Sequence, residues 1–249
     1  MKKTILALAI IMVFAASSFA SVSFMTAPGI GAGKYDLMGA YGSAHMGAIA
    51  NSDEPQDMDL TALGLKGTYG IMDGLDLVVG LSSDTAVNAK TNLDITQTSG
   101  STIGIGVKYS IPKSVNMMPV DAAVLVGYEQ TALGFKSPTV STTATSYALG
   151  LILSKQMGMC VPYGGIAVKS LNNDLGKSLG VTVDPVTGTG LMINLGVWVG
   201  IAANQAVAIE YDTENDSFSN ITKSGHAGPD KDGSATSVSG LSVGYVYMF

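Results

Sequence analysis

The stretch "LSVGYVYMF", residues 241–249, ends the chain on an alternating pattern. Every second position is apolar or aromatic, and these positions are Leu241, Val243, Tyr245, Tyr247 and Phe249. Such alternation indicates a β-strand with one apolar face. The last residues of a water-soluble domain usually fray in a polar tail. An apolar terminal strand therefore suggests a sheet with one face in lipid.

The other end of the chain has the pattern of a secretory signal peptide. Lys2 and Lys3 precede an apolar run at 5–16, and residues 17–20 form a small-residue cleavage site. We predict that 1–20 are removed and that 21–249 form a single domain. Ser21, rather than a cysteine, follows the predicted cleavage site, which argues against an N-terminal lipid anchor. No apolar run reaches the roughly 20 residues of a membrane-spanning helix, so we expect no helical anchor.

The charge balance excludes nucleic acid as a partner. The chain has 13 basic residues, all of them lysine, and 19 acidic residues. Without Lys2 and Lys3, the predicted mature chain has 11 lysines and a net charge of 11 − 19 = −8. A polyanion would be repelled by this balance. Cys160 is the single cysteine, so no internal disulfide can form, and we interpret it as a structural turn thiol.

Period-two alternation recurs in ten segments of the mature chain. Most are close to the 9 to 11 residues that a tilted strand needs to cross a bilayer. The predicted strands are 34–46, 59–69, 75–83, 101–111, 120–129, 145–154, 161–169, 189–200, 205–212 and 241–249. The segment 161–169 is ambiguous in which face is apolar, and counts of eight or twelve strands stay open.

The connections between these segments alternate in length. Short turns such as 72–74 and 202–204 alternate with long polar loops near 47–58, 84–100, 130–144, 170–188 and 213–237. Short periplasmic turns and long outer loops are typical of bacterial transmembrane β-barrels. All ten tyrosines lie inside predicted strands, mostly near their ends, which resembles two aromatic girdles. A soluble β-sandwich is the alternative.

The terminal strand resembles the assembly signal of bacterial outer-membrane barrels, a broad porin-like superfamily. Phe249 and the four alternating positions before it match that signal, and "YGIMDGLDLVVGLS", residues 69–82, is similar to its periplasmic hairpins. The resemblance implies a bacterial outer-membrane location. It also implies outer-membrane lipid and the barrel assembly machinery as partners. We therefore expect an all-β, closed, antiparallel up-and-down barrel of about ten strands.

If the apolar faces contact lipid, the opposite faces line the interior. The predicted interior residues of both charges are Lys34, Asp36, Lys66, Asp76, Lys108, Asp121, Glu129, Lys169, Glu210 and Asp212. Many neighbours on these faces are glycine, which favours some open space. Ten strands lie near the size at which barrels change from filled to open. A charge ladder that only stabilises the barrel and a narrow water-filled path both stay open.

Candidate catalytic and metal sites are weak. His45 and His226 are the only histidines, and neither belongs to a recognisable protease or lipase pattern, so we expect no enzyme activity. Residues 230–233, with Asp53, Glu54 and Asp57, fail the calcium-loop template, so we expect neither metal nor cofactor. Residues 28–31 are interpreted as a periplasmic or lumenal leader into the first strand, and Trp198 as an inward-facing ring.

Two function classes remain. One is a narrow porin-like channel for small solutes, with selectivity set weakly by mixed interior charge. The other is a structural or surface-interaction, adhesin-like barrel that binds ligands through its long outer loops.

Overall fold

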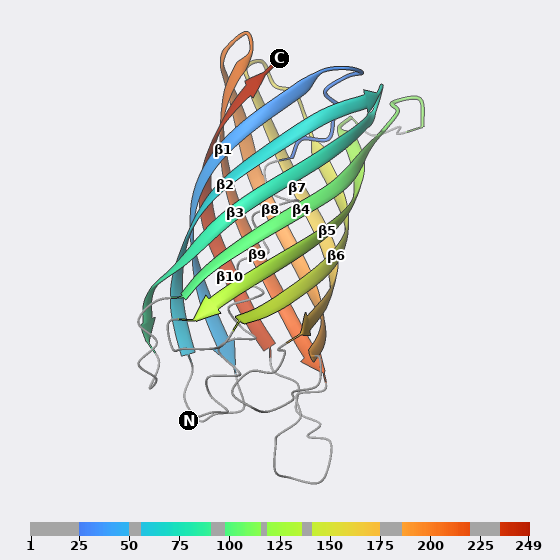
Figure 1. Cartoon of the computed structure of the whole chain (residues 1–249). Coiled ribbons are helices and arrows are strands. Elements are labelled where there is room, and N and C mark those ends of the chain that lie inside the picture. The colour runs from blue at the N-terminus through green and yellow to red at the C-terminus, as the bar shows by residue number, and fades with distance from the viewer. Residues whose placement is uncertain are drawn as a thin grey trace, which may run out of the picture.

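The computed structural model describes residues 25–49, 56–90, 98–115, 119–135, 141–174, 186–219 and 235–249. They form ten strands in one sheet (Figure 1). The strands are β1 (Tyr35–Ile49), β2 (Gln56–Met72), β3 (Leu75–Lys90), β4 (Thr98–Ile111), β5 (Asp121–Phe135), β6 (Ser141–Ser154), β7 (Cys160–Asp174), β8 (Val186–Ala202), β9 (Gln205–Ser219) and β10 (Ala235–Met248). Among these residues no helix is long and apolar enough to span a membrane. The predicted signal peptide lies outside the described residues.

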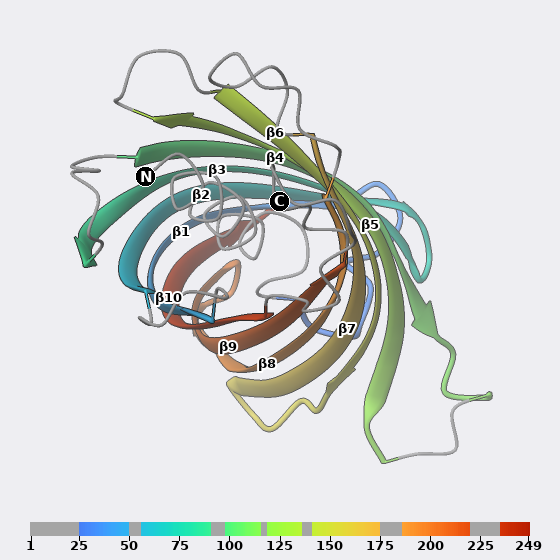
Figure 2. The same ribbon diagram turned by 90° about the horizontal axis from the view of Figure 1, so that it is seen from below.

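The sheet closes on itself, as predicted. Each strand pairs antiparallel with its sequence neighbours, and β1 pairs with β10 to complete the ring (Figure 2). This closing pair runs without a register shift from Asp36 opposite Met248 to Ile49 opposite Ala235. Closure leaves no sheet edge, so the backbone groups along every strand have a neighbouring strand to bond. The expectation of an all-β antiparallel barrel is therefore confirmed.

The wall is apolar outside and polar inside. On β2, for example, Leu65 is 66% exposed and its neighbour Lys66 is 8% exposed. Exposed large apolar side chains occur on all ten strands, whereas buried charged side chains occur on seven of them: β1, β2, β3, β4, β5, β7 and β9. Successive strand residues point to opposite faces, so this alternation places the apolar set outward. The arrangement is the reverse of a water-soluble core and suits a lipid surround.

The short connections gather at the end of the barrel that carries the C-terminus. Figure 1 shows the C-terminus and the β8–β9 turn at this end. The β2–β3 and β8–β9 turns contain only Asp73–Gly74 and Ala203–Asn204 between strands. Gly74 has a φ of 79°, a left-handed conformation that glycine adopts without steric cost. We refer to this end as the periplasmic end, following the convention of such barrels.

The strands extend further than the sequence predicted. They span 14 to 17 residues, because alternation continues into segments that we assigned to long loops. The clearest case is β9, predicted to end at residue 212 and observed to Ser219. Residues 213–217 of this extension are polar on both faces, a pattern that a search for apolar alternation does not recognise. The remaining parts of the long loops lie largely outside the described residues.

The tyrosines follow the girdle prediction with one exception. Seven of them, Tyr35, Tyr41, Tyr69, Tyr109, Tyr147, Tyr211 and Tyr245, are exposed on the outer face. Tyr128 and Tyr147 pack together there, with ring centroids 5.2 Å apart. Tyr163, in contrast, is buried inside the barrel, so its assignment to a girdle was wrong. It lies on β7, the strand whose apolar face the sequence left ambiguous.

The C-terminal residue closes the seam between the first and last strands. The Phe249 N–H donates to the Tyr35 carbonyl at 2.9 Å, and the two rings stack with centroids 4.4 Å apart. Tyr247 packs against the same Phe249 ring at 4.5 Å. The terminal aromatic therefore contributes both a backbone bond and ring contacts to β1–β10 closure.

We predict that Phe249→Ala lowers the free energy of unfolding by about 1 kcal/mol, because one stacked aromatic pair contributes about that amount. The measurement is the fraction of refolded protein that migrates as the compact form on an unboiled gel in detergent. Phe249→Tyr preserves the stack and should match the parent chain. An unchanged compact fraction for Phe249→Ala would contradict the role of this ring.

Candidate functional site

The inner wall of the barrel carries the charged residues. Those buried there among the described residues are Asp36, Asp76, Asp84, Glu129, Glu210, Asp212, Glu214 and Asp216, with Lys66, Lys108 and Lys169. Eight carboxylates thus share the interior with three lysines, a formal excess of five negative charges. This inner wall is the candidate functional site.

The charges near the periplasmic end are balanced. Asp36, Lys66, Asp76 and Lys108 lie within the first or last few residues of β1 to β4 at that end. The Lys108 ammonium is 3.1 Å from an Asp76 carboxylate oxygen, and both side chains are buried. Two carboxylates and two lysines here can neutralise one another, as a stabilising ladder requires.

The charges further from the periplasmic end are predominantly acidic. Lys169 Nζ lies 2.9 Å from Glu214 Oε2, and side-chain exposures are 0% and 2%. Glu210 accepts a hydrogen bond from the Asn194 amide at 3.0 Å, and Glu129 accepts one from the Ser146 hydroxyl at 3.3 Å. Five of the eight carboxylates, Asp84, Glu129, Asp212, Glu214 and Asp216, lie in this region with one lysine. Glu210 is no further along its strand from the periplasmic end than Lys66. Among the described residues of this region, carboxylates therefore outnumber lysines.

One strand supplies most of this acidity. On β9 the side chains of Glu210, Asp212, Glu214 and Asp216 all point inward, because alternate strand residues share a face. The sequence analysis found the first two. Glu214 and Asp216, like Asp84 on β3, were missed because they lie in segments assigned to loops. Continuing the period-two register through the polar residues would have placed them.

The N-terminal segment, residues 25–28, enters the barrel: Met25 and Ala27 are buried and Thr26 is half-buried, whereas Pro28 is exposed. Lys108 Nζ donates to the carbonyl oxygens of Thr26 and Pro28, each at 2.9 Å. The Ser110 hydroxyl donates to the Ala27 carbonyl at 2.7 Å, and the Ala27 N–H donates to Ser154 Oγ at 3.0 Å. The sequence interpretation, a periplasmic or lumenal leader at 28–31, left the location open and did not include 25–27.

Apolar residues surround the same segment. Met25 and Ala27 are buried in one cluster with Val78, Ala123, Leu125, Ala148, Ile152, Ala167 and Met192. These residues come from β3, β5, β6, β7 and β8, so the cluster reaches across several sides of the wall. The interior around this segment is therefore packed and apolar, whereas the interior further from the periplasmic end is acidic.

The segment turns into β1 through glycines. Gly31 and Gly33 have φ values of 93° and 73°, which favour glycine because larger residues rarely adopt them. The Gly31 carbonyl lies against Cα of Gly70, where any side chain would collide. The Gly33 N–H then donates to the Gly70 carbonyl at 2.8 Å and begins the pairing with β2.

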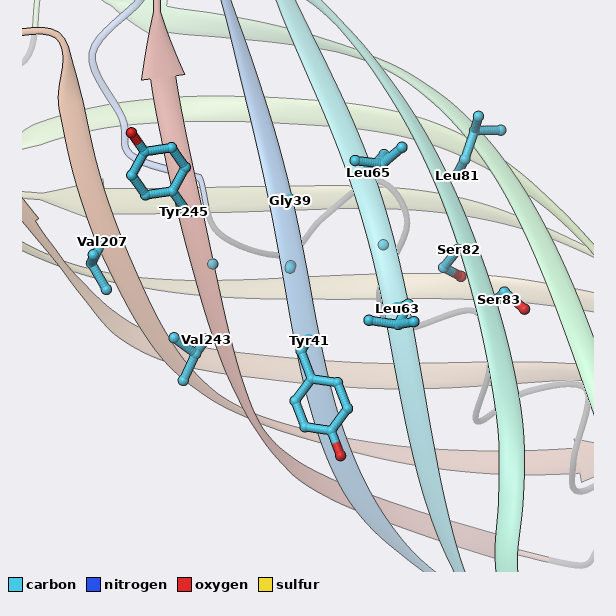
Figure 3. Close-up of a pocket in the computed structure, with 13 residues that line it drawn as sticks. Gly39, Tyr41, Leu63, Leu65, Leu81, Ser82, Ser83, Val207, Val243 and Tyr245 are labelled. Atoms are coloured by element: carbon cyan, nitrogen blue, oxygen red, sulfur yellow. The ribbon is translucent and has the colours of Figure 1, made fainter.

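The outer face has a separate apolar hollow of about 700 Å³ (Figure 3). It lies over Gly39, where the row of outward side chains on β1 is interrupted. The rings of Tyr41 and Tyr245 and the side chains of Leu63, Leu65 and Val243 surround it. Its lining is almost wholly apolar, as expected for a surface in contact with acyl chains.

Two predicted interior residues lie elsewhere. Lys34 is exposed and precedes β1, so its assignment to the interior was wrong; the chain is still turning there. Asp121 lies at the periplasmic rim, partly buried, with its carboxylate 3.1 Å from Lys113 Nζ. The other eight predicted residues, Asp36, Lys66, Asp76, Lys108, Glu129, Lys169, Glu210 and Asp212, are buried.

The remaining candidates lie as follows. Leu241, Val243, Tyr245 and Phe249 are exposed on the outer face, and Tyr247 is partly buried. Trp198 packs against interior residues Met38, Ala206, Ala208 and Val246. Cys160 is the first residue of β7 rather than a turn residue.

The histidine and acidic-loop candidates add no described site. His45 Nδ1 is 3.0 Å from Asp59 on the exposed face. His226 and 230–233 lie outside the described residues, as do Asp53, Glu54 and the Asp57 side chain. Within the described part of the chain, no three histidine, cysteine or acidic side chains are grouped to hold a metal.

A closed ten-stranded antiparallel barrel, apolar outside and charged inside, is the architecture of an outer-membrane β-barrel. The chain belongs to DUF6588, a family of unknown function, whose model matches residues 65–222. No curated protein sequence matches the chain.

Solved structures with similar folds include three outer-membrane proteins. Neisserial surface protein A is 14% identical, covering 87% of this chain and 99% of its own, with a TM-score of 0.41. The translocator domain of autotransporter NalP from Neisseria meningitidis is 10% identical, with coverages of 96% and 94% and a TM-score of 0.47. The COG4313 outer membrane channel from Pseudomonas putida F1 is 14% identical, with coverages of 90% and 98% and a TM-score of 0.45. At these similarities the fold assignment rests on the strand pairing described above.

We predict that Lys169→Met lowers the free energy of unfolding by about 3 kcal/mol, because it leaves the Glu214 carboxylate buried without its lysine. The double variant Lys169→Met/Glu214→Gln should recover most of that loss. Lys113→Met removes a pair whose lysine is 77% exposed and should cost less than about 1 kcal/mol. Denaturant unfolding in detergent measures all three, and equal midpoints for the two single lysine variants would contradict the prediction.

Proposed function

We propose that this protein is a narrow, water-containing channel of the bacterial outer membrane that passes small solutes and favours cations. The excess of five negative charges on the described inner wall is the observation that supports the proposal most directly. A structural ladder in a dry interior would need near-complete pairing, because an uncompensated buried charge costs several kcal/mol. Water and mobile cations that reach the interior lower that cost.

Polar atoms on the inner wall support the same conclusion. Both carboxylate oxygens of Asp84 and the hydroxyls of Ser82 and Ser242 are buried, and no described protein atom forms a hydrogen bond with them. Buried polar groups of folded proteins are almost always satisfied, by water where protein partners are missing. These groups therefore favour a hydrated interior.

Small residues on the inner wall leave room for such a path. The glycines that face inward include Gly64, Gly80, Gly104, Gly106, Gly127, Gly150, Gly196 and Gly244. Some of this room is filled, since the Tyr163 ring lies over Gly196 and the Met38 side chain over Gly244. The proposal is accordingly a narrow path rather than a wide pore.

The proposal includes the cellular context. The chain is exported by its signal peptide, inserted by the barrel assembly machinery and surrounded by outer-membrane lipid. It acts without a cofactor and is not an enzyme. A cation entering from outside meets the acidic region of β9 first, which raises its local concentration.

Planar bilayers test the proposal. We expect discrete conductance steps and, in a potassium chloride gradient, a reversal potential that indicates preference for potassium. Asp84→Asn and Asp212→Asn replace buried carboxylates on opposite walls, so each should move the cation-to-anion permeability ratio towards one, by about twofold or more. The effect should shrink at high salt, where charges are screened.

Asp73→Asn is the matched control, because Asp73 lies in an exposed periplasmic turn, and it should leave the ratio unchanged. Anion preference in the parent chain would overturn the proposed selectivity. The absence of conductance in every variant would favour the alternative of a structural or surface-interaction barrel.

A further inference from the structure

The N-terminal segment occupies the periplasmic part of the interior rather than leaving it directly. Its polar contacts are with β4 and β6, and Met25 and Ala27 belong to an apolar cluster whose other members come from β3, β5, β6, β7 and β8. These strands form one continuous part of the wall, so the segment fills the periplasmic part of the interior beside them. It therefore reduces the space through which a solute can cross the barrel.

The attachment of the segment is separate from the hydrogen bonds that hold the barrel. In the described part of the chain, backbone pairing of the N-terminal region begins at Gly31, and residues 25–30 make no backbone–backbone bond. Their polar contacts are with the side chains of Lys108, Ser110 and Ser154. The segment can leave these side chains without breaking the sheet.

Lys108 is the main polar anchor. An ammonium has three hydrogens, and here three oxygens surround it: the carbonyls of Thr26 and Pro28 at 2.9 Å, and Asp76 at 3.1 Å. Two of its three acceptors belong to the segment. Lys108 therefore joins the N-terminal segment to the charged group at the periplasmic end.

We propose that residues 25–30 act as a plug that closes the periplasmic mouth of the channel, with Gly31 and Gly33 as its hinge. Displacement of the plug opens the path between the acidic interior and the periplasm. This inference rests on the proposed channel function. It assigns to that channel a built-in closing element and names the side chains that hold it.

A disulfide between the plug and the wall tests both placement and effect. The Ala27 N–H lies 3.0 Å from Ser154 Oγ, which limits the separation of the two Cα atoms to about 7 Å, close to the upper end of the range that a disulfide spans. The variant is Ala27→Cys/Ser154→Cys in a Cys160→Ser background, in the full mature chain. Oxidation should cross-link the pair, which a mass measurement detects. Reduction in a planar bilayer should then raise the time-averaged conductance at least tenfold.

The single variant Ala27→Cys and the Cys160→Ser background are the matched controls, and neither should respond to reductant. Failure of the folded double variant to cross-link would overturn the placement of the plug. Cross-linking with equal conductance before and after reduction, in a protein that conducts, would overturn the gating role alone. No conductance in any variant, with cross-linking intact, would instead refute the proposed channel.

A second variant weakens the attachment of the plug without leaving a buried charge unpaired. Lys108→Met/Asp76→Asn removes both members of the ion pair and the two hydrogen bonds that Lys108 donates to the segment. We expect the open fraction of single-channel records to rise severalfold relative to the parent chain. Lys113→Met/Asp121→Asn removes an ion pair at the rim that does not touch the segment and should leave the open fraction unchanged. Equal open fractions in the two double variants would count against the plug.

Discussion

The pairing of β1 with β10 is the constraint on which the rest of this structure depends. In hydrocarbon, an unbonded backbone N–H or carbonyl costs several kcal/mol, so a sheet can cross a bilayer only if it has no free edge. Fourteen successive residue pairs join the two strands, and Phe249 extends the seam by one bond to Tyr35. The apolar C-terminal strand is therefore required by closure.

Closure also determines what can be placed inside. Where one face of every strand must be apolar, the charged residues of that zone are directed to the interior. The interior of this barrel divides into two regions: a balanced group of Asp36, Lys66, Asp76 and Lys108, and an acidic group dominated by β9. The first region can be stable without water. The second has an excess of carboxylates among the described residues, and this difference is the basis of the proposed transport function.

Much of this architecture is readable from the sequence, because the alternation of apolar residues is imposed by lipid. Residues such as Leu63, Leu65, Val243 and Tyr245 identified both the strands and their outer face. The same criterion failed at the ends of the strands, beyond the part with an apolar outer face. Asp84, Glu214 and Asp216 continue the inner face of β3 and β9, but they do not alternate with apolar residues. It also failed at Tyr163, which is aromatic and points inward, over Gly196. The contacts of Thr26, Ala27 and Pro28 were not predictable, since they are long-range and involve backbone groups without a sequence pattern.

The location of the N-terminal segment is explained by the hydrogen bonds between its carbonyl groups and the Lys108 ammonium. Beside Asp76 alone, the Lys108 ammonium would have donors left over in a packed region, and the carbonyls of Thr26 and Pro28 have no strand to bond them. Each satisfies the other, and the insertion of Met25 and Ala27 into the apolar cluster adds burial. Part of this gain is offset by the loss of water from the ammonium and the carbonyls, but a hydrogen bond to a charged group still contributes about 1.5–3 kcal/mol net. The balance between the inserted and released segment therefore depends on the Lys108 hydrogen bonds together with the burial of Met25 and Ala27, and the loss of either is enough to shift it.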